Sequence, residues 1–334
     1  MSKKLSFVLP CYNVERYIAD CLDSIYAQGL TEDEFEVVCV NDCSTDGTRS
    51  IISEYEKKHS NLTLIDHLKN SGGCGVPRNT GFRNAIGDYI CFVDADDMLP
   101  KNAMKSICYI AQEDNLDILL YNHIVLCNGT YYESKIKYSD SDVLSGGDYV
   151  EKCLNGNIGI FASAWSKLFN RTFLLRHSIW YTDLIMSEDP VFSWEAMICA
   201  NRVKSIHDTG YIFRANDNSM TSSKKMRKLS VFYSVSILYP NALVTLLDRY
   251  RDNAPCVIRK AIVNEIKTEI GGFFKKYLSY GEEGRREIYS LILEKASPIR
   301  RLSKYMNRKQ KIAFLSRKMG YGIFDTIVKK LFNN

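Results

Sequence analysis

The sequence lacks paired cysteines, internal repeats and low-complexity segments. Its eleven cysteines are an odd number and include no CxxC pair, so neither a disulfide framework nor a zinc ribbon is expected. An apolar run near the start, Leu5–Leu9, ends at Pro10 and is too short for the core of a signal peptide. With 46% hydrophobic and 25% charged residues over 334 positions, a globular protein of a reducing cytoplasm is expected.

Charge is distributed unevenly along the chain. Residues 224–334 include 24 basic and 9 acidic residues, a net charge of +15, whereas residues 1–223 include 20 basic and 30 acidic residues, a net charge of −10. A basic region of this kind attracts phosphate groups on a membrane, a lipid-linked substrate or nucleic acid. Solvated helix faces explain its two basic clusters equally well. The clusters are Lys224, Lys225, Arg227 and Lys228, and Arg300, Arg301, Lys304, Arg308, Lys309 and Lys311.

Apolar segments alternate with helical patterns over residues 1–125. The near-continuous apolar runs indicate strands that are covered on both faces of a mainly parallel sheet. Residues 17–26 place their apolar side chains on one helical stripe between the first two strands. Repeated strand–helix units predict an α/β fold with helices flanking the sheet. The predicted strands are Leu5–Leu9, Phe35–Val40, Leu62–Asp66, Tyr89–Asp94 and Asp117–Tyr121.

After about residue 223 the pattern becomes helical to the end, which predicts a C-terminal helical appendage. Residues 229–247 carry no charge and approach the length of a membrane span. Because this stretch contains Pro240, Asn241 and several hydroxyl residues, we expect a buried pair of helices with a break near Pro240.

Polar residues follow the first, second and fourth predicted strands, at the sheet edge where open α/β sheets bind ligands. Three carboxylates, Asp94, Asp96 and Asp97, stand within four positions after the apolar strand. Turn formation explains one or two of them, whereas a hard divalent cation would explain all three. Asp94 and Asp96 would share a face if the strand continued through them. For four other residues at this edge, helix capping is the favoured interpretation: Asn13, Ser44, Thr45 and Asp46.

A glycine-rich loop spans residues 70–81. Its glycines follow the third strand and no Walker lysine is present, so a dinucleotide fingerprint and a P-loop are both excluded. Arg78 either makes surface ion pairs or binds a phosphate or nucleotide together with backbone N–H groups.

Taken together, these segments resemble the family 2 glycosyltransferases of the bacterial polysaccharide or cell-surface glycan type. The resemblance covers residues 5 to about 100 through four ordered motifs and extends more weakly to about residue 223. A fifth motif, Ser187-Glu188-Asp189, is similar to the later acidic motif of the family. The four motifs are Val8-Leu9-Pro10-Cys11-Tyr12-Asn13-x-Glu15, Val40-Asn41-Asp42-Cys43-Ser44-Thr45-Asp46-Gly47-Thr48, Pro77-Arg78-Asn79-Thr80-Gly81 and Phe92-Val93-Asp94-Ala95-Asp96-Asp97.

The resemblance implies a GT-A fold, a UDP-linked sugar donor, Mn²⁺ or Mg²⁺, and inversion at the anomeric carbon. It places Asp96 and Asp94 on the metal and Asp189 as the general base, with Glu188 beside it. Without the other motifs, helix N-terminal charge would be the favoured explanation of Glu188 and Asp189. The implied nucleotide-sugar-binding residues are Pro10, Tyr12, Asn13, Glu15, Asp42, Asn70, Arg78, Asp94, Ala95 and Arg214.

The sequence departs from the family pattern at two of these motifs. Asn41 stands where the family has an aspartate, and Pro77 where it has an alanine. No Gln-x-x-Arg-Trp motif occurs, which argues against a processive synthase. Ser219-Met220-Thr221, after Arg214, resembles a segment that lies against donor phosphates in some members.

These features predict a glycosyltransferase domain over residues 1–223, with a nucleotide-sugar half (1–125) and an acceptor half (126–223), and a basic helical region over 224–334. The acceptor is expected to be a saccharide, including a lipid-diphosphate-linked one, at the inner face of the cell membrane. A catalytically inactive sugar-nucleotide-binding module is the alternative. The glycine-rich signature of sugar-1-phosphate nucleotidyltransferases is missing from this sequence, which argues against that class of enzyme. A nucleic acid partner is not expected, because the sequence contains no recognised nucleic-acid-binding module.

Overall fold

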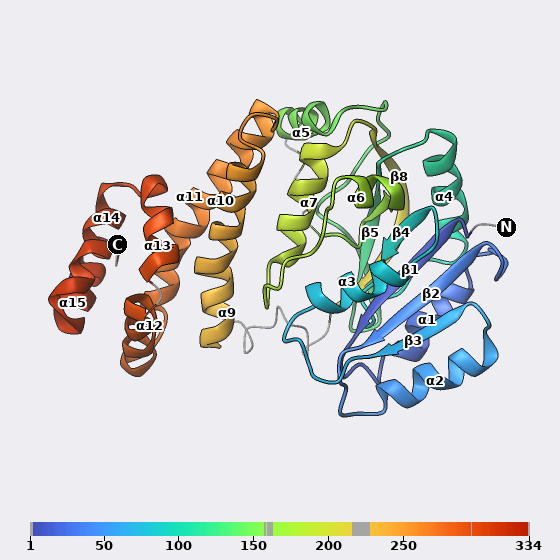
Figure 1. Cartoon of the computed structure of the whole chain (residues 1–334), viewed down its shortest axis with the longest axis horizontal. Helices are drawn as coiled ribbons and strands as arrows, with labels where there is room; N and C mark the ends of the chain where they lie inside the picture. Colours follow the sequence, from blue (N-terminus) through green and yellow to red (C-terminus); the bar gives the residue numbers. More distant parts are fainter. Residues whose placement is uncertain (1–2, 157, 159–162, 216–227, 295, 333–334) are drawn as a thin grey trace. The chain divides into compact units, whose positions relative to one another are not determined.

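The computed structural model describes residues 3–156, 158, 163–215, 228–294 and 296–332. The chain forms two compact units. The first comprises Met1–Asp183 and Glu188–Ser219 and contains the sheet, and the second comprises Leu184–Ser187 and Met220–Asn334 and is helical (Figure 1).

The first unit is built on one eight-stranded sheet with the order β3-β2-β1-β4-β7-β5-β6, in which β8 also pairs with β5. Strands β1 to β4 are mutually parallel, β7 is antiparallel to β4 and β5, and β8 is parallel to β5. The predicted α/β class, with a mainly parallel sheet flanked by helices and a C-terminal helical region, is confirmed. The strands are β1 (Leu5–Cys11), β2 (Phe35–Asn41), β3 (Leu62–Asp66), β4 (Tyr89–Phe92), β5 (Ile118–Cys127), β6 (Thr130–Glu133), β7 (Lys167–Asn170) and β8 (Val203–Arg214).

Helices flank this sheet, and the apolar stripe predicted over residues 17–26 forms the buried face of α1 through Ile18, Cys21, Leu22 and Ile25. Helix α3 packs on β1 and β2 at Gly81, where an added Cβ would lie 2.5 Å from Val8 Cγ1. The helices are α1 (Ile18–Tyr26), α2 (Thr48–Lys58), α3 (Gly75–Asn84), α4 (Ala103–Glu113), α5 (Gly146–Asn155), α6 (Arg171–Arg176) and α7 (Glu188–Cys199).

The fourth strand ends earlier than the sequence predicts. Strand β4 stops at Phe92, and residues 94–97 form a turn in which Asp97 N–H donates to the carbonyl of Asp94 at 2.9 Å. The expectation that a continuing pleat aligns Asp94 and Asp96 is therefore wrong.

The second unit begins with one continuous helical run in place of the predicted pair of helices. Helix α9 (Leu229–Tyr233), the π-helical segment η1 (Ser234–Leu238) and α10 (Tyr239–Arg249) follow one another without a break. The wider π-turn directly precedes Pro240, whose ring would clash with the carbonyl four residues back in a regular α-helix. Among the described residues, one helical segment, Leu229–Arg249, has the length and composition of a membrane span. However, 67% of its most apolar window is buried within the protein, as in the core helix of a soluble protein.

The remaining helices of this unit pack around α11, whose isoleucines at positions 258, 262, 266 and 270 form a buried stripe at four-residue spacing. Helices α10 and α15 both contact it. The elements are α11 (Cys256–Leu278), α12 (Glu282–Glu294), α13 (Ala296–Leu302), η2 (Ser303–Tyr305), α14 (Arg308–Ser316), η3 (Arg317–Met319) and α15 (Tyr321–Phe332).

Candidate functional site

The loops that follow β1 and β2 lie side by side, because the register pairs Cys11 with Asn41 at the carboxyl ends of these parallel strands. Asn13 Oδ1 accepts from Thr45 N–H at 2.8 Å, and Glu15 Oε2 accepts from Gly47 N–H at 2.7 Å.

Polar side chains therefore join the two loops to each other. The capping interpretation is wrong for Asn13 and Ser44, whose side-chain oxygens accept backbone N–H groups of the opposite loop. It holds in part for Asp46, whose Oδ1 accepts from the N–H of Thr48, the first residue of α2, at 3.0 Å. Pro10 is buried in β1, and Tyr12, with 47% of its surface exposed, follows the strand at the same edge.

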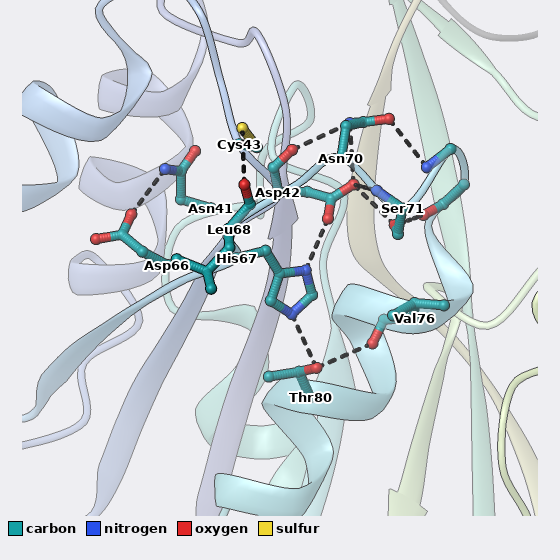
Figure 2. Close-up of polar contacts among 12 residues, drawn as sticks. Asn41, Asp42, Cys43, Asp66, His67, Leu68, Asn70, Ser71, Val76 and Thr80 are labelled. Atoms are coloured by element: carbon teal, nitrogen blue, oxygen red, sulfur yellow. Dashed lines mark hydrogen bonds and ion pairs between the residues drawn. The ribbon is translucent and has the colours of Figure 1, made fainter.

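Asp42 is buried directly after β2 and is held by four hydrogen bonds (Figure 2). Its Oδ2 accepts from Asn70 Nδ2 at 3.0 Å and from the backbone N–H and hydroxyl of Ser71 at 2.9 and 2.8 Å. Its Oδ1 pairs with His67 Nδ1 at 2.7 Å. Oδ1 therefore accepts one of these four hydrogen bonds and Oδ2 accepts the other three.

The neighbouring Asn41 explains why the family aspartate is replaced at this position. Its Nδ2 donates to Asp66 Oδ1 at 2.7 Å, and its Oδ1 accepts from Ser44 N–H at 3.1 Å. An amide can bridge a carboxylate and a backbone donor, whereas an aspartate here would face Asp66 with the same charge.

His67 is a site residue that the sequence analysis missed. It follows β3 at the same sheet edge, and its ring bridges Asp42 and the Thr80 hydroxyl, with Nε2 to Oγ1 at 3.0 Å (Figure 2). The signal was a polar residue immediately after a predicted strand, the same signal that identified Asp42.

The three aspartates after β4 differ in their burial and in their hydrogen-bond partners. Asp94 pairs with Arg78, while Asp97 is buried and accepts from the Tyr211 hydroxyl at 2.8 Å and from Arg214 N–H at 2.6 Å. Burial, reinforced by the charges of Asp96 and Asp94, raises the pKa of Asp97 well above its ordinary value. Asp96 is partly exposed, and Ala95 between them is buried.

Arg78 joins residues from three separate segments into one cluster. Its Nη2 donates to Asp94 Oδ1 at 2.6 Å, and its Nη1 donates to Glu188 Oε1 at 2.8 Å and to Asp189 Oδ1 at 2.7 Å. The guanidinium also stacks over Tyr181 at 5.2 Å. With a 3% exposed side chain, Arg78 does not make the surface ion pairs that the sequence permitted.

In this cluster, burial raises the pKa values of Glu188 and Asp189, and the positive charge of Arg78 opposes that rise. Burial and the charge of Asp189 raise the pKa of Glu188 to about 7. Burial also raises the pKa of Asp189, against the opposing effect of Arg78. Burial disfavours the charged form of Arg78, but Asp189 and Asp94 outweigh it and raise the pKa of Arg78. Glu188 and Asp189 also form the first turn of α7, where the helix dipole favours negative charge.

Arg214 lies at the end of β8, beyond Asp97. Its Nη2 pairs with Asp20 at 3.1 Å, and its guanidinium stacks over Tyr17 at 5.1 Å. Residues 219–221, together with Lys224, Lys225 and Arg227 of the first basic cluster, lie outside the described residues.

Asp94 and Asp96 fit a hard divalent cation in ligand type, because both offer carboxylate oxygens. Within the described part of the chain, no group of three or more His, Cys, Asp or Glu side chains forms a ready-made metal site. Magnesium-type sites commonly combine one or two carboxylates with waters and substrate phosphates. The residues present therefore fit a cation that arrives with a diphosphate.

Two groups of predicted residues are thus assembled at one sheet edge. Asp42 and Asn70 are hydrogen-bonded to each other, and Arg78, Asp94, Glu188 and Asp189 form a charged cluster. Helix α3 starts between these groups in the chain and carries Arg78. This arrangement can hold a polar ring on one side and place an ionised carboxylate near a reacting centre on the other.

Comparison with known proteins gives one consistent family. The model "Glycosyl transferase family 2" matches residues 6–171. The chain is 33% identical over 211 residues to a poly(ribitol-phosphate) beta-glucosyltransferase of Bacillus spizizenii, covering 63% of this chain and 32% of the relative. It is 32% identical over 233 residues to the poly(ribitol-phosphate) beta-N-acetylglucosaminyltransferase TarS of Staphylococcus aureus, covering 70% of this chain and 39% of the relative.

A solved structure has the same fold. The crystal structure of S. aureus TarS 1–349 in complex with UDP-GlcNAc matches with a TM-score of 0.70 at 23% identity, covering 98% of this chain and 90% of that chain. The chain spans about a third of the length of the two curated relatives.

Proposed function

Because the chain belongs to glycosyl transferase family 2, we propose that it transfers a sugar from a UDP-linked donor to a hydroxyl group of an acceptor. One observation carries this proposal: Arg78 gathers Asp94, at the sheet edge, and Asp189, at the start of α7, into one buried cluster. One guanidinium group thereby contacts both Asp94, which is proposed to bind the donor, and Asp189, which is proposed to be the base.

The nucleotide is proposed to bind at the edge formed by the loops after β1 and β2. Asp42 Oδ1 would accept the N3–H of uracil, since it is the less occupied oxygen of this carboxylate, with one of the four hydrogen bonds against three on Oδ2. Tyr12 offers an exposed ring for stacking against the base. The UDP-GlcNAc bound to TarS supports a UDP-linked donor.

A divalent cation, Mn²⁺ or Mg²⁺, is proposed to bind at Asp96 and Asp94 together with the donor diphosphate. When bound, it would offset the negative charge that develops on the departing diphosphate. Asp97 is a poor candidate for a third ligand because its carboxyl group is buried and already hydrogen-bonded to Tyr211 and Arg214.

Asp189 is proposed to be the general base. An acceptor hydroxyl is a weak nucleophile and must lose its proton to a carboxylate within about 3 Å as attack begins. Arg78 orients the Asp189 carboxylate at 2.7 Å. A single base on the face opposite the leaving group gives direct displacement with inversion at the anomeric carbon.

The acceptor is proposed to be a hydroxyl-bearing chain rich in phosphate, either a polyol phosphate or a lipid-diphosphate-linked saccharide. The two relatives act, by name, on poly(ribitol-phosphate). The net charge of +15 over residues 224–334 would attract such an anionic acceptor.

The protein is proposed to work in the cytoplasm at the inner face of the membrane. Helix α14 and segment η3 present exposed basic and apolar side chains at every third or fourth position. Three of the apolar ones, Ile312, Leu315 and Met319, are 44%, 60% and 61% exposed. The basic side chains of this surface would attract anionic lipid headgroups. Its members are Arg308, Lys311, Ile312, Leu315, Lys318 and Met319.

A thermal-shift panel of nucleotide sugars, with and without Mn²⁺, tests the donor. Ligand binding to the folded state raises the melting temperature by mass action. We expect a UDP-sugar with Mn²⁺ to give the largest rise, and Asp42→Asn to abolish it by replacing an acceptor oxygen with a donor. A GDP-sugar that stabilises as strongly as a UDP-sugar would contradict the proposed base specificity. Binding without hydrolysis or transfer would instead favour the inactive module.

A further inference from the structure

Tyr211 on β8 is a buried tyrosine to which the proposed reaction assigns no role. None of its surface is exposed, and its backbone is held in the sheet by pairing with His123 of β5. Its ring stacks against the ring of Trp165, with the centroids 4.4 Å apart. Because both the backbone and the ring of Tyr211 are anchored, its hydroxyl group is held at a fixed place.

The turn after β4 depends on contacts with other elements for its position, because the strand itself ends at Phe92. The Tyr211 hydroxyl contacts both ends of this turn. It accepts a hydrogen bond from Asp94 N–H at 3.0 Å and donates one to Asp97 Oδ2 at 2.8 Å. Asp97 N–H in turn donates to the carbonyl of Asp94 at 2.9 Å. One hydroxyl group therefore joins the first and last aspartates of the turn, with Asp96 between them.

Three further hydrogen bonds join the turn to β8 without using this hydroxyl. Arg214 N–H donates to Asp97 Oδ1 at 2.6 Å. Met98 N–H donates to the carbonyl of Ile212 at 3.1 Å, and Ile212 N–H donates to the carbonyl of Met98 at 2.9 Å. A variant without the Tyr211 hydroxyl would keep these contacts, so the turn should remain attached to β8 while Asp94 loses its link to the strand.

A carboxylate supports cation binding only when it is held in the arrangement that the cation requires, and Mg²⁺ requires near-ideal octahedral geometry. Hydrogen-bond partners that orient the ligands typically change metal affinity by about 10–100-fold. Both proposed ligands adjoin this hydroxyl: Asp94 donates to it through its backbone, and Asp96 precedes Asp97, which accepts from it.

We propose that Tyr211 is a positioning residue for the cation site, whose hydroxyl fixes the turn so that Asp94 and Asp96 are held in one arrangement for a divalent cation. This rests on the proposed function, in which these two aspartates bind Mn²⁺ or Mg²⁺ with the donor diphosphate. Tyr211 itself need not touch the cation, because its one hydroxyl hydrogen is already donated to Asp97.

Mn²⁺ binding tests this role, because Tyr211→Phe removes the hydroxyl and keeps the stacked ring. In the presence of UDP, the affinity for Mn²⁺, followed by the electron paramagnetic resonance signal of the free ion, should fall about 10–100-fold. Binding of UDP without metal, measured by calorimetry, should be unchanged.

Tyr89→Phe is the matched control. Tyr89 is also buried, at the opposite end of β4 from the turn, and its hydroxyl makes two hydrogen bonds, to the carbonyls of Ala111 at 2.6 Å and Leu116 at 3.1 Å. This variant also loses a buried, hydrogen-bonded hydroxyl group, but it should bind Mn²⁺ as the wild type does.

The Mn²⁺ dependence of turnover tests the consequence for the reaction. Turnover of Tyr211→Phe should be lower than that of the wild type at limiting Mn²⁺ and should recover at saturating Mn²⁺, since the variant keeps the proposed base. The same fractional loss at every Mn²⁺ concentration would overturn the positioning role.

These experiments separate the failure of this proposal from that of the proposed function. Unchanged Mn²⁺ affinity in Tyr211→Phe, or an equal loss in Tyr89→Phe, would overturn the role of Tyr211 and leave the proposed cation site standing. A wild-type protein that binds no Mn²⁺ in the presence of UDP would overturn the proposed cation site and, with it, this role.

Discussion

At the scale of single residues, the charged cluster around Arg78 stabilises a buried arginine and also holds the carboxylate that is proposed to be the base. Arg78 is almost completely buried, so its charge is stable only because three carboxylates surround it. Burial in turn raises the pKa of two of those carboxylates, Glu188 and Asp189. Groups with perturbed pKa values that converge from separate elements are typical of catalytic sites.

Replacing Asp189 by asparagine tests the base. The amide keeps the shape of the side chain but cannot accept a proton, so turnover should fall at least 100-fold, since base catalysis typically contributes about 10²–10⁴. Binding of the UDP-sugar, measured by calorimetry, should remain. In the wild type, turnover should be lost as the pH falls through the raised pKa of Asp189.

Asp183→Asn is the matched control, because Asp183 is exposed and lies six positions before Asp189. It should retain wild-type turnover and pH dependence. Near-normal turnover in Asp189→Asn would remove this residue from the proposed role.

At the scale of elements, helix α3 positions the cluster. It carries Arg78 and lies against β1 and β2 at Gly81, where an added Cβ would meet Val8 Cγ1 at 2.5 Å and Val40 Cγ2 at 3.4 Å. The helix can approach the sheet this closely only because the residue at the contact has no side chain.

Gly81→Ala should therefore destabilise the fold by about 1–3 kcal/mol, the usual effect of overpacking. Chemical denaturation would measure it, and the double variant Gly81→Ala/Val8→Ala should recover part of the loss. Gly271→Ala in α11, where the nearest atom is 3.9 Å from the added Cβ, should be neutral or stabilising. Equal effects of both alanines would show that helix propensity, and not the contact with β1, decides the result.

At the scale of the whole molecule, charge is divided along the chain, with −10 over residues 1–223 and +15 over residues 224–334. The carboxylates proposed as metal ligands and as the base lie in the acidic part. The exposed stripe of α14 and η3 lies in the basic part and combines cations with apolar side chains. This division fits a protein that binds an anionic surface with one region and performs chemistry with another.

Vesicle sedimentation tests the membrane role of the basic region. Each cation near an anionic surface contributes about 1 kcal/mol, so Lys309→Glu/Lys311→Glu should weaken binding to phosphatidylserine-containing vesicles at least tenfold. Binding by the wild type should also fall as salt is raised. Lys101→Glu/Lys105→Glu, which makes the same charge change at exposed positions of the first unit, is the control. Binding that is unchanged by salt would contradict the electrostatic role.

The sequence alone determined the class of fold, because apolar runs are local patterns, and it identified the candidate donor residues through their resemblance to the family motifs. Apolar runs identify buried strands wherever they occur, and the segments after β1, β2 and β4 contained Tyr12, Asp42 and Asp94. The same rule applied to β3 would have found His67. The helix breaker at Pro240 was misread, since a π-turn before it is a local adjustment that composition does not reveal.

Only the tertiary structure decided how these residues are used. It bonds Asn13 and Glu15 across two loops, turns Asp97 into the interior, and buries Arg78 among carboxylates from positions 94, 188 and 189. The physical reason is that charge states and hydrogen-bond partners depend on distances and burial between segments more than a hundred residues apart, and a linear pattern carries neither quantity.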